Sequence, residues 1–282
     1  MQISKSVLAL TAYVLLTSTL VGLVGALTGL GGGVLLVPML VLLFHVNVHY
    51  AVGASLISVI ATSSGASAAY IREGYTNLRI ATFLQVATVG GALLGALLAE
   101  HLRGRVIAIV FGVVLLFSAY FSLRRREVQE EGRPSSSLAI RLDMEGSLPV
   151  VGGWKPYGVY NLMGGFGLML VAGTLSGLLG IGSGAVGVLA MDQVMRLPYK
   201  VSTTTSNFMI GVTAAASAGV YITRGFIDPG LTMPVMIGVF LGAVVGARFL
   251  MVAKAEWLRI LFSLIVLLLA LQMIHSALTG RI

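Results

Sequence analysis

The sequence has no cysteine, and only 10% of its 282 residues are charged. Without cysteine there can be no disulfide, no thiolate metal site and no cysteine nucleophile. A soluble domain usually carries about 25% charged residues, so this chain has too little polar surface to cover a water-soluble globule. Together with 57% hydrophobic residues and a mean hydropathy of +0.98, the shortage of charge indicates a membrane protein.

Motifs for catalysis or nucleotide hydrolysis are also missing. There is no H-E-x-x-H and no G-K-[ST], which argues against a zinc protease and against an ATP motor in this chain. Residues 182–187 match G-x-G-x-x-G, but they lie between apolar segments and not in a βαβ unit, so we reject a dinucleotide site. Four scattered histidines near the ends of apolar runs indicate interfacial positions. These histidines are His45, His49, His101 and His275. We expect no enzyme activity, no cofactor and no metal.

Long apolar runs of about 20 residues, with at most one charged residue each, make up most of the chain, and such runs are typical of membrane-spanning helices. Two shorter runs each follow a glycine cluster. The pattern predicts an all-α fold, a polytopic membrane helix bundle. The long runs are Val7–Leu30, Tyr50–Ile71, Ile80–Ala99, Val106–Leu123, Val159–Leu179, Val201–Thr223, Leu231–Val252 and Trp257–Leu278, and the short ones are Val34–Phe44 and Ala185–Met195.

The chain is similar to itself at a shift of 151 positions. Aligned pairs include Gly29 with Gly180, Gly31 with Gly182, Gly33 with Gly184, Ser55 with Ser206 and Gly91 with Gly242. Self-similarity of this kind indicates a duplicated unit. We expect two homologous transmembrane repeats, residues 1–123 and 159–282, joined by a polar linker, residues 124–158. The linker carries an arginine triplet and a serine run, which predict a polar loop on the cytoplasmic side.

The net charge of +8 comes from cations that lie mostly between the apolar runs. This placement indicates that the excess positive charge sets the orientation of the chain in the membrane and lies beside anionic lipid headgroups, rather than binding nucleic acid. If each short run crosses the membrane, each repeat has five crossings, the repeats are inverted and both termini lie outside. Twelve Lys and Arg then share the linker side and five lie opposite. However, about 12 residues cover roughly 18 Å of a ~30 Å core, so re-entrant short runs, with four crossings per repeat, stay open.

The two glycine clusters are the first candidate site. Several glycines in five residues break a helix, and hydrocarbon tolerates a break only where protein buries it or it lines a wet cavity. Breaks at equivalent places of two repeats are the best sequence pointer to a transporter's binding site, and helix N-termini attract anions. The alternative is close helix packing, which we expect for Gly22, Gly91 and Gly95. The candidate substrate-binding residues are Gly31, Gly32, Gly33, Gly182, Ser183 and Gly184.

Polar residues inside the apolar runs are the second candidate site. Ser55, Thr205, Ser206 and Asn207 offer neutral donors, which bind an oxyanion without the cost of burying a countercharge. The alternative for such hydroxyls is a bond to their own helix backbone.

Two charged residues are candidates for coupling or for attracting the anion. Asp192 would be functional at the bilayer centre, but it could instead form an i,i+4 pair with Arg196. Arg248 could attract the anion, or its side chain could reach the membrane interface.

Several features together resemble one family, the sulfite exporter TauE/SafE family, also called the toluene-sulfonate-uptake family. They are the duplicated unit, the Gly-Leu-Gly-Gly-Gly break followed by Pro38, the second break, and the Gly-Ala-Arg stretch at residues 246–248. The resemblance covers nearly the whole chain except the linker.

The resemblance implies a multi-pass transporter of the prokaryotic plasma membrane, for sulfite, organosulfonates or related sulfur oxyanions. We expect a secondary transporter that works by alternating access. The alternatives are a passive anion channel and a non-transporting scaffold subunit. Coupling to H⁺ or Na⁺ and a homo-oligomeric state stay open.

Overall fold

The computed structural model describes residues 2–28, 32–72, 74–123, 135–150, 153–250 and 255–280 of the chain. The first half contains the helices α1 (Gln2–Thr28), α2 (Gly33–Phe44), α3 (Val48–Arg72), α4 (Leu78–His101) and α5 (Gly104–Leu123). A short helix, α6 (Ser137–Arg141), and the strands β1 (Gly146–Val150) and β2 (Gly153–Tyr157) follow. The second half contains α7 (Leu162–Leu179), α8 (Gly184–Leu189), the π-helical turn η1 (Ala190–Val194), α9 (Tyr199–Thr223), α10 (Pro229–Leu250) and α11 (Ala255–Leu278).

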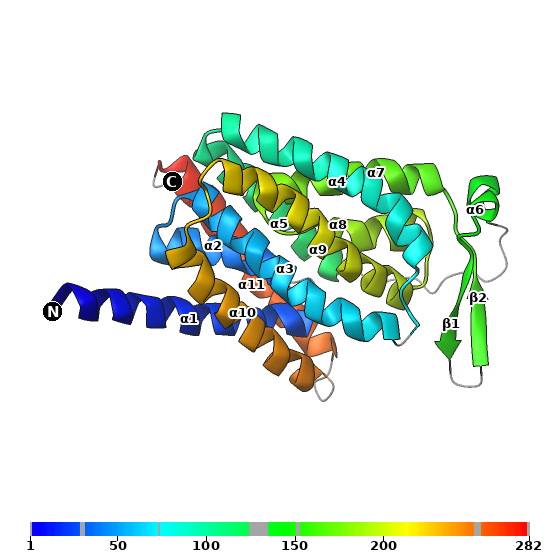
Figure 1. Ribbon diagram of the computed structural model, residues 1–282, viewed down its shortest axis with the longest axis horizontal. Coiled ribbons are helices and arrows are strands. Elements are labelled where there is room, and N and C mark those ends of the chain that lie inside the picture. The colour runs from blue at the N-terminus through cyan, green and yellow to red at the C-terminus, as the bar shows by residue number, and fades with distance from the viewer. Residues whose placement is uncertain are drawn as a thin grey trace.

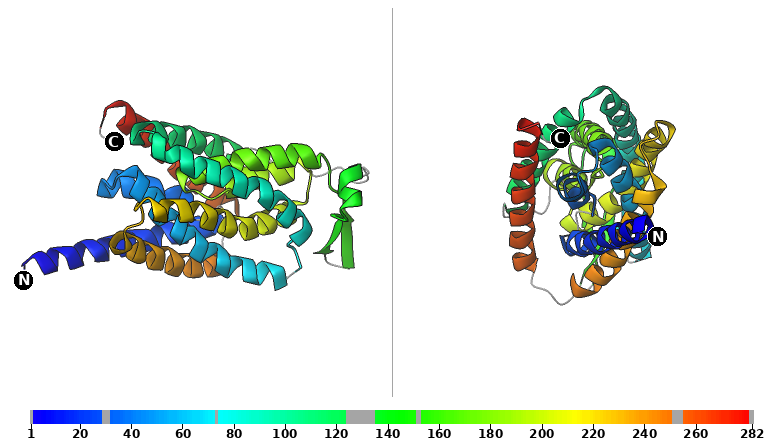
Figure 2. Two further views of the ribbon diagram at one scale, coloured as in Figure 1. Left: turned by 45° about the horizontal axis from the view of Figure 1, so that its top comes forward. Right: turned by 90° about the vertical axis from the view of Figure 1, so that its left-hand side faces the viewer.

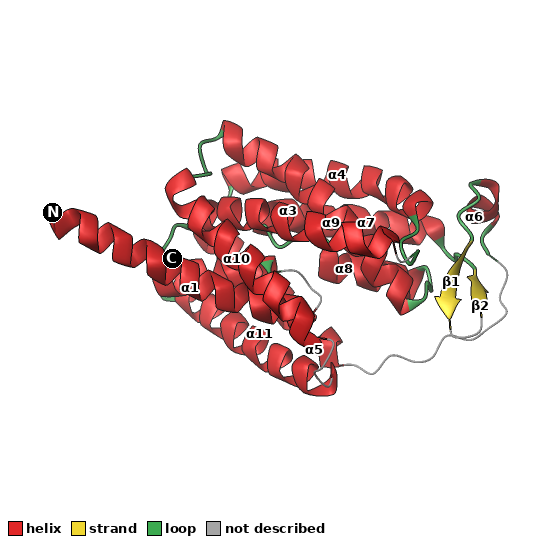
Figure 3. Cartoon of the chain, turned by 60° about the horizontal axis from the view of Figure 1, so that its bottom comes forward, coloured by secondary structure: helices red, strands yellow, loops and turns green. Residues whose placement is uncertain are grey.

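Almost all of the described chain is helical, and the expected all-α membrane class is confirmed (Figure 3). Helices satisfy their own backbone hydrogen bonds, which hydrocarbon demands. The outer face of α4 exposes four leucines, Leu93, Leu94, Leu97 and Leu98, where a soluble protein would avoid a continuous apolar patch. Within the described residues, three helices are long and apolar enough to cross a membrane, namely Leu78–His101, Leu162–Leu179 and Pro229–Gly246.

The bundle has two distinct ends. Both termini lie at one of them, the terminal end, and α6, β1 and β2 lie at the other, the linker end (Figure 1). The helices α3 and α9 pack against each other, α4 lies against α9, and α10 lies against α3. Around them α1 packs along α10, α7 packs along α4, and α5 pairs with α11 at the periphery (Figure 2). The main helix pairs therefore join one half of the chain to the other.

Each short apolar segment forms a hairpin with the helix that precedes it. The amide of Tyr160, just before α7, donates to the carbonyl of Met195, just after η1, at 3.1 Å, so this hairpin enters and leaves at the linker end. In the first half, α1 begins and α2 ends at the terminal end (Figure 1). The turns of both hairpins meet inside the bundle, because a Cβ atom added at Gly33 would lie 3.1 Å from the Gly180 carbonyl.

Five crossings per repeat, which the counting of cations favours, stay a prediction. The 12 residues of α2 cover about 18 Å of a ~30 Å core, so α2 alone is shorter than the core. A hairpin returns to the end from which it started, so it leaves the connecting loops on the same sides as two full crossings would. The grouping of cations by loop is unchanged.

Glycines bring α7 onto α4, and α1 onto α10, until the backbones touch. A side chain at any of these glycines would collide with a carbonyl of the facing helix. The close packing predicted for Gly22, Gly91 and Gly95 is confirmed. The contacts between α4 and α7 recur between α10 and α1 at the shift of 151 positions. Gly91 faces the carbonyl of Leu170, and the equivalent Gly242 faces that of Thr19. Likewise Gly173 faces the carbonyl of Thr88, and the equivalent Gly22 faces that of Val239.

Part of the linker, which the sequence predicts to be a polar loop, has a defined fold. The helix α6 and the antiparallel strands β1 and β2 form a small unit, the linker lobe (Figure 2). Ala139 and Met144 are buried in an apolar cluster that also contains Ile80, Leu162 and Met195. These two residues fix the lobe to the linker end, because burying apolar surface stabilises the contact.

The packing of α4 on α7 yields a first prediction. Changing Gly91 to Ala places a methyl group against the Leu170 carbonyl, so we expect a loss of roughly 1–3 kcal/mol of stability and a lower midpoint of thermal unfolding. The neighbouring Gly90 is exposed and has no atom within 4 Å of an added Cβ, so Gly90→Ala is a matched control that should not lower the midpoint. Equal midpoints for the two variants, measured in detergent, would contradict the role of Gly91.

Candidate functional site

The two glycine breaks meet in the interior of the bundle. A Cβ atom added at Gly33, the first residue of α2, would lie 3.1 Å from the Gly180 carbonyl oxygen and 3.1 Å from the Ser55 Oγ. Ser55, on α3, donates a 2.7 Å hydrogen bond to the same carbonyl. All three residues are buried. A hydroxyl of the first half thus satisfies a carbonyl that is freed where α7 ends in the second half.

The backbone at the second break requires glycine. Gly180 and Gly182 have φ angles of +68° and +72°, a left-handed conformation that only glycine adopts at little cost. Gly180 also ends α7 by donating its N–H to the Ser176 carbonyl at 2.8 Å, and an added Cβ would lie 2.9 Å from the Val52 carbonyl. At the first break Gly32 is buried, and Gly31 lies outside the described residues.

One polar residue of α9, Ser206, lies against the second break. Ser206 is buried and donates to the Gly184 carbonyl, at the start of α8, at 3.2 Å. Ser183 is buried directly before α8, but its hydroxyl does not cap that helix. Asn207 is half-buried beside Ser206, and among the described residues its side chain has no hydrogen-bond partner. The structure therefore brings Ser183, Ser206 and the two breaks together.

Most other hydroxyls in these helices bond to the backbone of their own helix. This is the alternative that the sequence left open, and it reduces the number of candidate ligands. Ser55 and Ser206, which the shift of 151 positions aligns, instead bond to the second break. The residues with backbone bonds are Ser58, Thr62, Ser63, Ser64, Thr203, Thr204 and Thr213.

The two charged candidates do not lie at the breaks in the part of the structure that is described. Asp192 is in η1, which leads back to the linker end, and it is half-buried and accepts from the Gln193 amide at 3.1 Å. Arg248 is near the C-terminal end of α10, and its side chain is outside the described part. No group of three or more His, Asp or Glu that could hold a metal ion occurs among the described residues.

Thr205 is next to Ser206 in the sequence, but its side chain forms its hydrogen bond at the linker end. Its Oγ1 accepts from the backbone N–H of Asn77 at 3.1 Å. Asn77 is the N-cap of α4, where its Oδ1 accepts from the Ile80 amide, and its Nδ2 donates to Met144 O and Tyr157 Oη at 3.0 Å each. Asn77 therefore connects α9 and α4 to the linker lobe.

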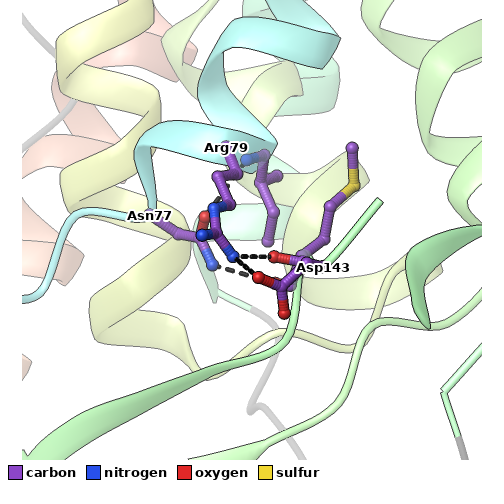
Figure 4. A network of polar contacts seen from close by, with 5 residues as sticks. Asn77, Arg79 and Asp143 are labelled. Carbon is purple, nitrogen blue, oxygen red and sulfur yellow. Dashed lines mark hydrogen bonds and ion pairs between the residues drawn. The ribbon is translucent and has the colours of Figure 1, made fainter. Parts of the chain in front are cut away.

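Two further features belong to the contact between the lobe and the bundle. Arg79, next to Asn77 on the first turn of α4, forms an ion pair with Asp143 (Figure 4). Burial raises the pKa of Tyr157, and the hydrogen bond from Asn77 lowers it in part, so the phenol stays neutral at neutral pH. Sequence reasoning missed this network. An Asn directly before an apolar run is an N-cap signal, but nothing local indicates its distant partners.

These features define a class of protein. The chain is an all-α membrane protein in which two helical hairpins enter the bundle from opposite ends and meet through glycine breaks. Residues 14–273 match the family described as sulfite exporter TauE/SafE, and the chain belongs to this family. It is therefore a membrane transporter by family.

Relatives of known name agree with this assignment. The chain is 27% identical over 237 residues to the probable membrane transporter protein YdhB of Bacillus subtilis. This alignment covers 84% of the chain and 89% of the relative. It is 22% identical over 263 residues to YunE of the same organism, with 90% and 94% covered. A probable membrane transporter protein of Xylella fastidiosa is 25% identical over 260 residues, with 90% and 91% covered. No solved structure is significantly similar to the chain.

Removing the Ser55 hydroxyl should destabilise the second break. Ser55→Ala leaves the buried Gly180 carbonyl without this donor, which costs about 1–3 kcal/mol. Ser58→Ala is the matched control, since Ser58 is buried on the same helix and bonds to the Ala54 carbonyl one turn back. We expect Ser55→Ala to have the lower midpoint of thermal unfolding. A Ser58→Ala protein that unfolds first would count against the role of Ser55.

Loosening Asn77 should release the linker lobe. Asn77→Gly removes the side-chain bonds to Met144 and Tyr157, while glycine at an N-cap costs only a few tenths of a kcal/mol. We expect faster cleavage within residues 137–157 by limited proteolysis. Asn161→Gly is the control, because Asn161 caps α7 through the Gly164 amide. If both variants are cleaved at the wild-type rate, Asn77 does not hold the lobe.

Proposed function

We propose that the chain is a secondary transporter that moves a small sulfur-containing oxyanion, such as sulfite or a sulfonate, across the prokaryotic plasma membrane. The main support for this proposal is the contact of the two glycine breaks inside the bundle, where Ser55 donates a hydrogen bond to the Gly180 carbonyl. The family name supports sulfite as the first substrate to test. The cations of the linker support a cytoplasmic position for the lobe.

The chemistry of this region suits an oxyanion. The first turn of α2 has backbone N–H groups without intrahelical partners, and its N-cap Gly32 supplies no side-chain bond. Helix N-termini favour negative charge, and the Asn207 amide adds two further donors. Neutral donors bind the anion without a buried cation, which would be expensive when the site is empty. The proposed site comprises Gly31, Gly32, Gly33, Ser55, Gly182, Ser183, Gly184, Ser206 and Asn207.

Alternating access is supported by the arrangement of the halves. The hairpins enter from opposite ends, and the backbone contacts of α1 on α10 match those of α7 on α4 at the shift of 151 positions. If the halves are inverted repeats, an exchange of their two conformations moves the opening from one end to the other. The network at Asn77 and Thr205 then has to break whenever the linker end opens.

A passive channel is the second class of function to consider. The close packing around Ser55, Gly33 and Gly180 favours a carrier, because a channel would need a continuous wet path through this region. Conductance far above the turnover of a carrier would reverse this preference. A scaffold would bind no anion and would tolerate substitutions at the breaks.

Transport by the purified protein tests the proposal directly. We expect saturable uptake of radiolabelled sulfite into proteoliposomes, with competition from thiosulfate or a sulfonate but not from chloride. Uptake with and without a pH gradient would show whether protons are coupled, with Asp192 as the candidate group. No uptake of any sulfur anion by folded protein would contradict the proposed function.

Variants at the breaks should stop transport without removing the protein from the membrane. A Cβ atom at Gly33 would lie 2.7 Å from Val59 Cγ2 and would crowd the breaks, and Ser206→Ala removes the bond to Gly184. We expect Gly33→Ala and Ser206→Ala to lower the uptake rate at least about tenfold, the effect of roughly 1.4 kcal/mol. Gly219→Ala, at an exposed glycine with no atom within 4 Å, should transport at the wild-type rate.

A further inference from the structure

A cavity of about 340 Å³ lies beside the last residues of α2. This end of α2 is at the terminal end of the bundle, away from the linker lobe (Figure 1). We call this cavity the outer vestibule. It lies between the C-terminal end of α2, the start of α3 and the start of α5. Its lining residues are Val41, His45, Val46, Asn47, Val48, Arg103, Gly104 and Arg105.

The vestibule concentrates positive charge that no lining acid neutralises. It is lined by Arg103 and Arg105 and, in the described part of the chain, by no carboxylate. The Arg103 side chain is exposed and makes no hydrogen bond or ion pair within the described residues. By contrast, Arg224 at the same end is paired with Glu100 at 2.7 Å.

Neither helix stability nor topology accounts for these arginines. They stand at the N-terminal end of α5, where the helix dipole favours acidic residues and disfavours cations. The cations that set topology gather on the cytoplasmic side, which we assign to the opposite, linker end. Arg105 is partly structural, since its Nη2 donates to the Leu278 carbonyl at 2.7 Å. Arg103 has no such partner among the described residues.

Other donors line the same cavity. The Oδ1 of Asn47 accepts from the His49 backbone amide at 3.0 Å, which leaves the Asn47 Nδ2 as a donor. His45 ends α2 in a left-handed conformation, with φ of 51°, and its side chain is exposed. A guanidinium, an amide and an imidazole around one cavity form a set of donors suited to an oxyanion.

The vestibule and the glycine breaks lie along the same two helices, α2 and α3. Val41, on its wall, is eight residues, or about 12 Å, beyond Gly33 on α2. Val48 is seven residues, or about 10 Å, before Ser55 on α3. The cavity therefore lies on the terminal-end side of the place where the breaks meet.

We infer that the outer vestibule is a separate binding site for a dissolved oxyanion, in which Arg103 captures the anion before it reaches the breaks. This inference rests on the proposed function. A positive cavity raises the local concentration of an anion and its association rate by about 10- to 1,000-fold at low ionic strength, and salt reduces the effect. Arg103 thus sets the apparent affinity for the anion at the terminal end.

The test compares binding and transport in variants of Arg103. Radiolabelled sulfate is the binding probe, with protein in nanodiscs of phosphatidylcholine alone or with phosphatidylglycerol added. We expect Arg103→Gln to weaken sulfate binding roughly tenfold and Arg103→Lys to retain most of it. Arg141→Gln is the matched control, because it removes one exposed arginine of α6 at the opposite end and should leave binding unchanged. Thermal unfolding of each variant checks that it is folded.

The outcomes separate this inference from the proposed function. Binding that is retained in Gly33→Ala or Ser206→Ala but lost in Arg103→Gln supports the vestibule, even if no sulfur anion is transported. In uptake assays, Arg103→Gln should raise the half-saturating sulfite concentration with little change in maximal rate, and the difference should shrink as salt is added. Equal binding by Arg103→Gln and wild type would overturn the inference. So would occupation by phosphatidylglycerol without measurable binding of sulfate.

Discussion

A helix that stops inside a lipid bilayer frees backbone groups that hydrocarbon cannot satisfy, and the rest of this structure depends on how they are satisfied. At the end of α7 the Gly180 carbonyl accepts a 2.7 Å hydrogen bond from the Ser55 hydroxyl. At the start of α8 the Gly184 carbonyl accepts a 3.2 Å hydrogen bond from the Ser206 hydroxyl. Ser55 belongs to the other half of the chain. The second hairpin can therefore end in mid-bundle only when α3 of the first half is in place, so the second half does not form its interior alone.

The same mutual dependence governs the helices around the breaks. Contact of α7 with α4 and of α1 with α10 puts glycines directly on facing carbonyls, and these pairs again join the two halves. Without a hydrophobic force between helices in lipid, such close backbone contacts provide much of the attraction. They also leave little freedom within each pair. Under the proposed alternating access, we expect the pairs to move as units against α3 and α9, whose hydroxyls contact the second break.

The sequence was sufficient to predict what depends on local composition. The apolar runs became helices, and Gly22, Gly91 and Gly95 pack as expected. It failed where distant residues decide. Counting cations could not give the depth of the short hairpins, because a hairpin and two crossings leave the loops on the same sides. The fold of the linker depends on the burial of Ala139 and Met144 against helices far along the chain. Thr205 serves the linker end because Asn77, 128 positions away, donates to it.

The distribution of charge gives the proposed transport path a physical logic. At the breaks the described side chains that form hydrogen bonds are the neutral hydroxyls of Ser55 and Ser206. By contrast, the Arg103 guanidinium, which has no partner among the described residues, lies at the terminal end, in the vestibule. A cation buried at the breaks would be costly whenever the site is empty and would hold an anion tightly when it is full. Near water the same cation costs little and still attracts anions over about a Debye length. Capture by Arg103 and transfer to neutral donors thus separates attraction from release, which a carrier needs because a substrate that binds too well at the centre cannot leave.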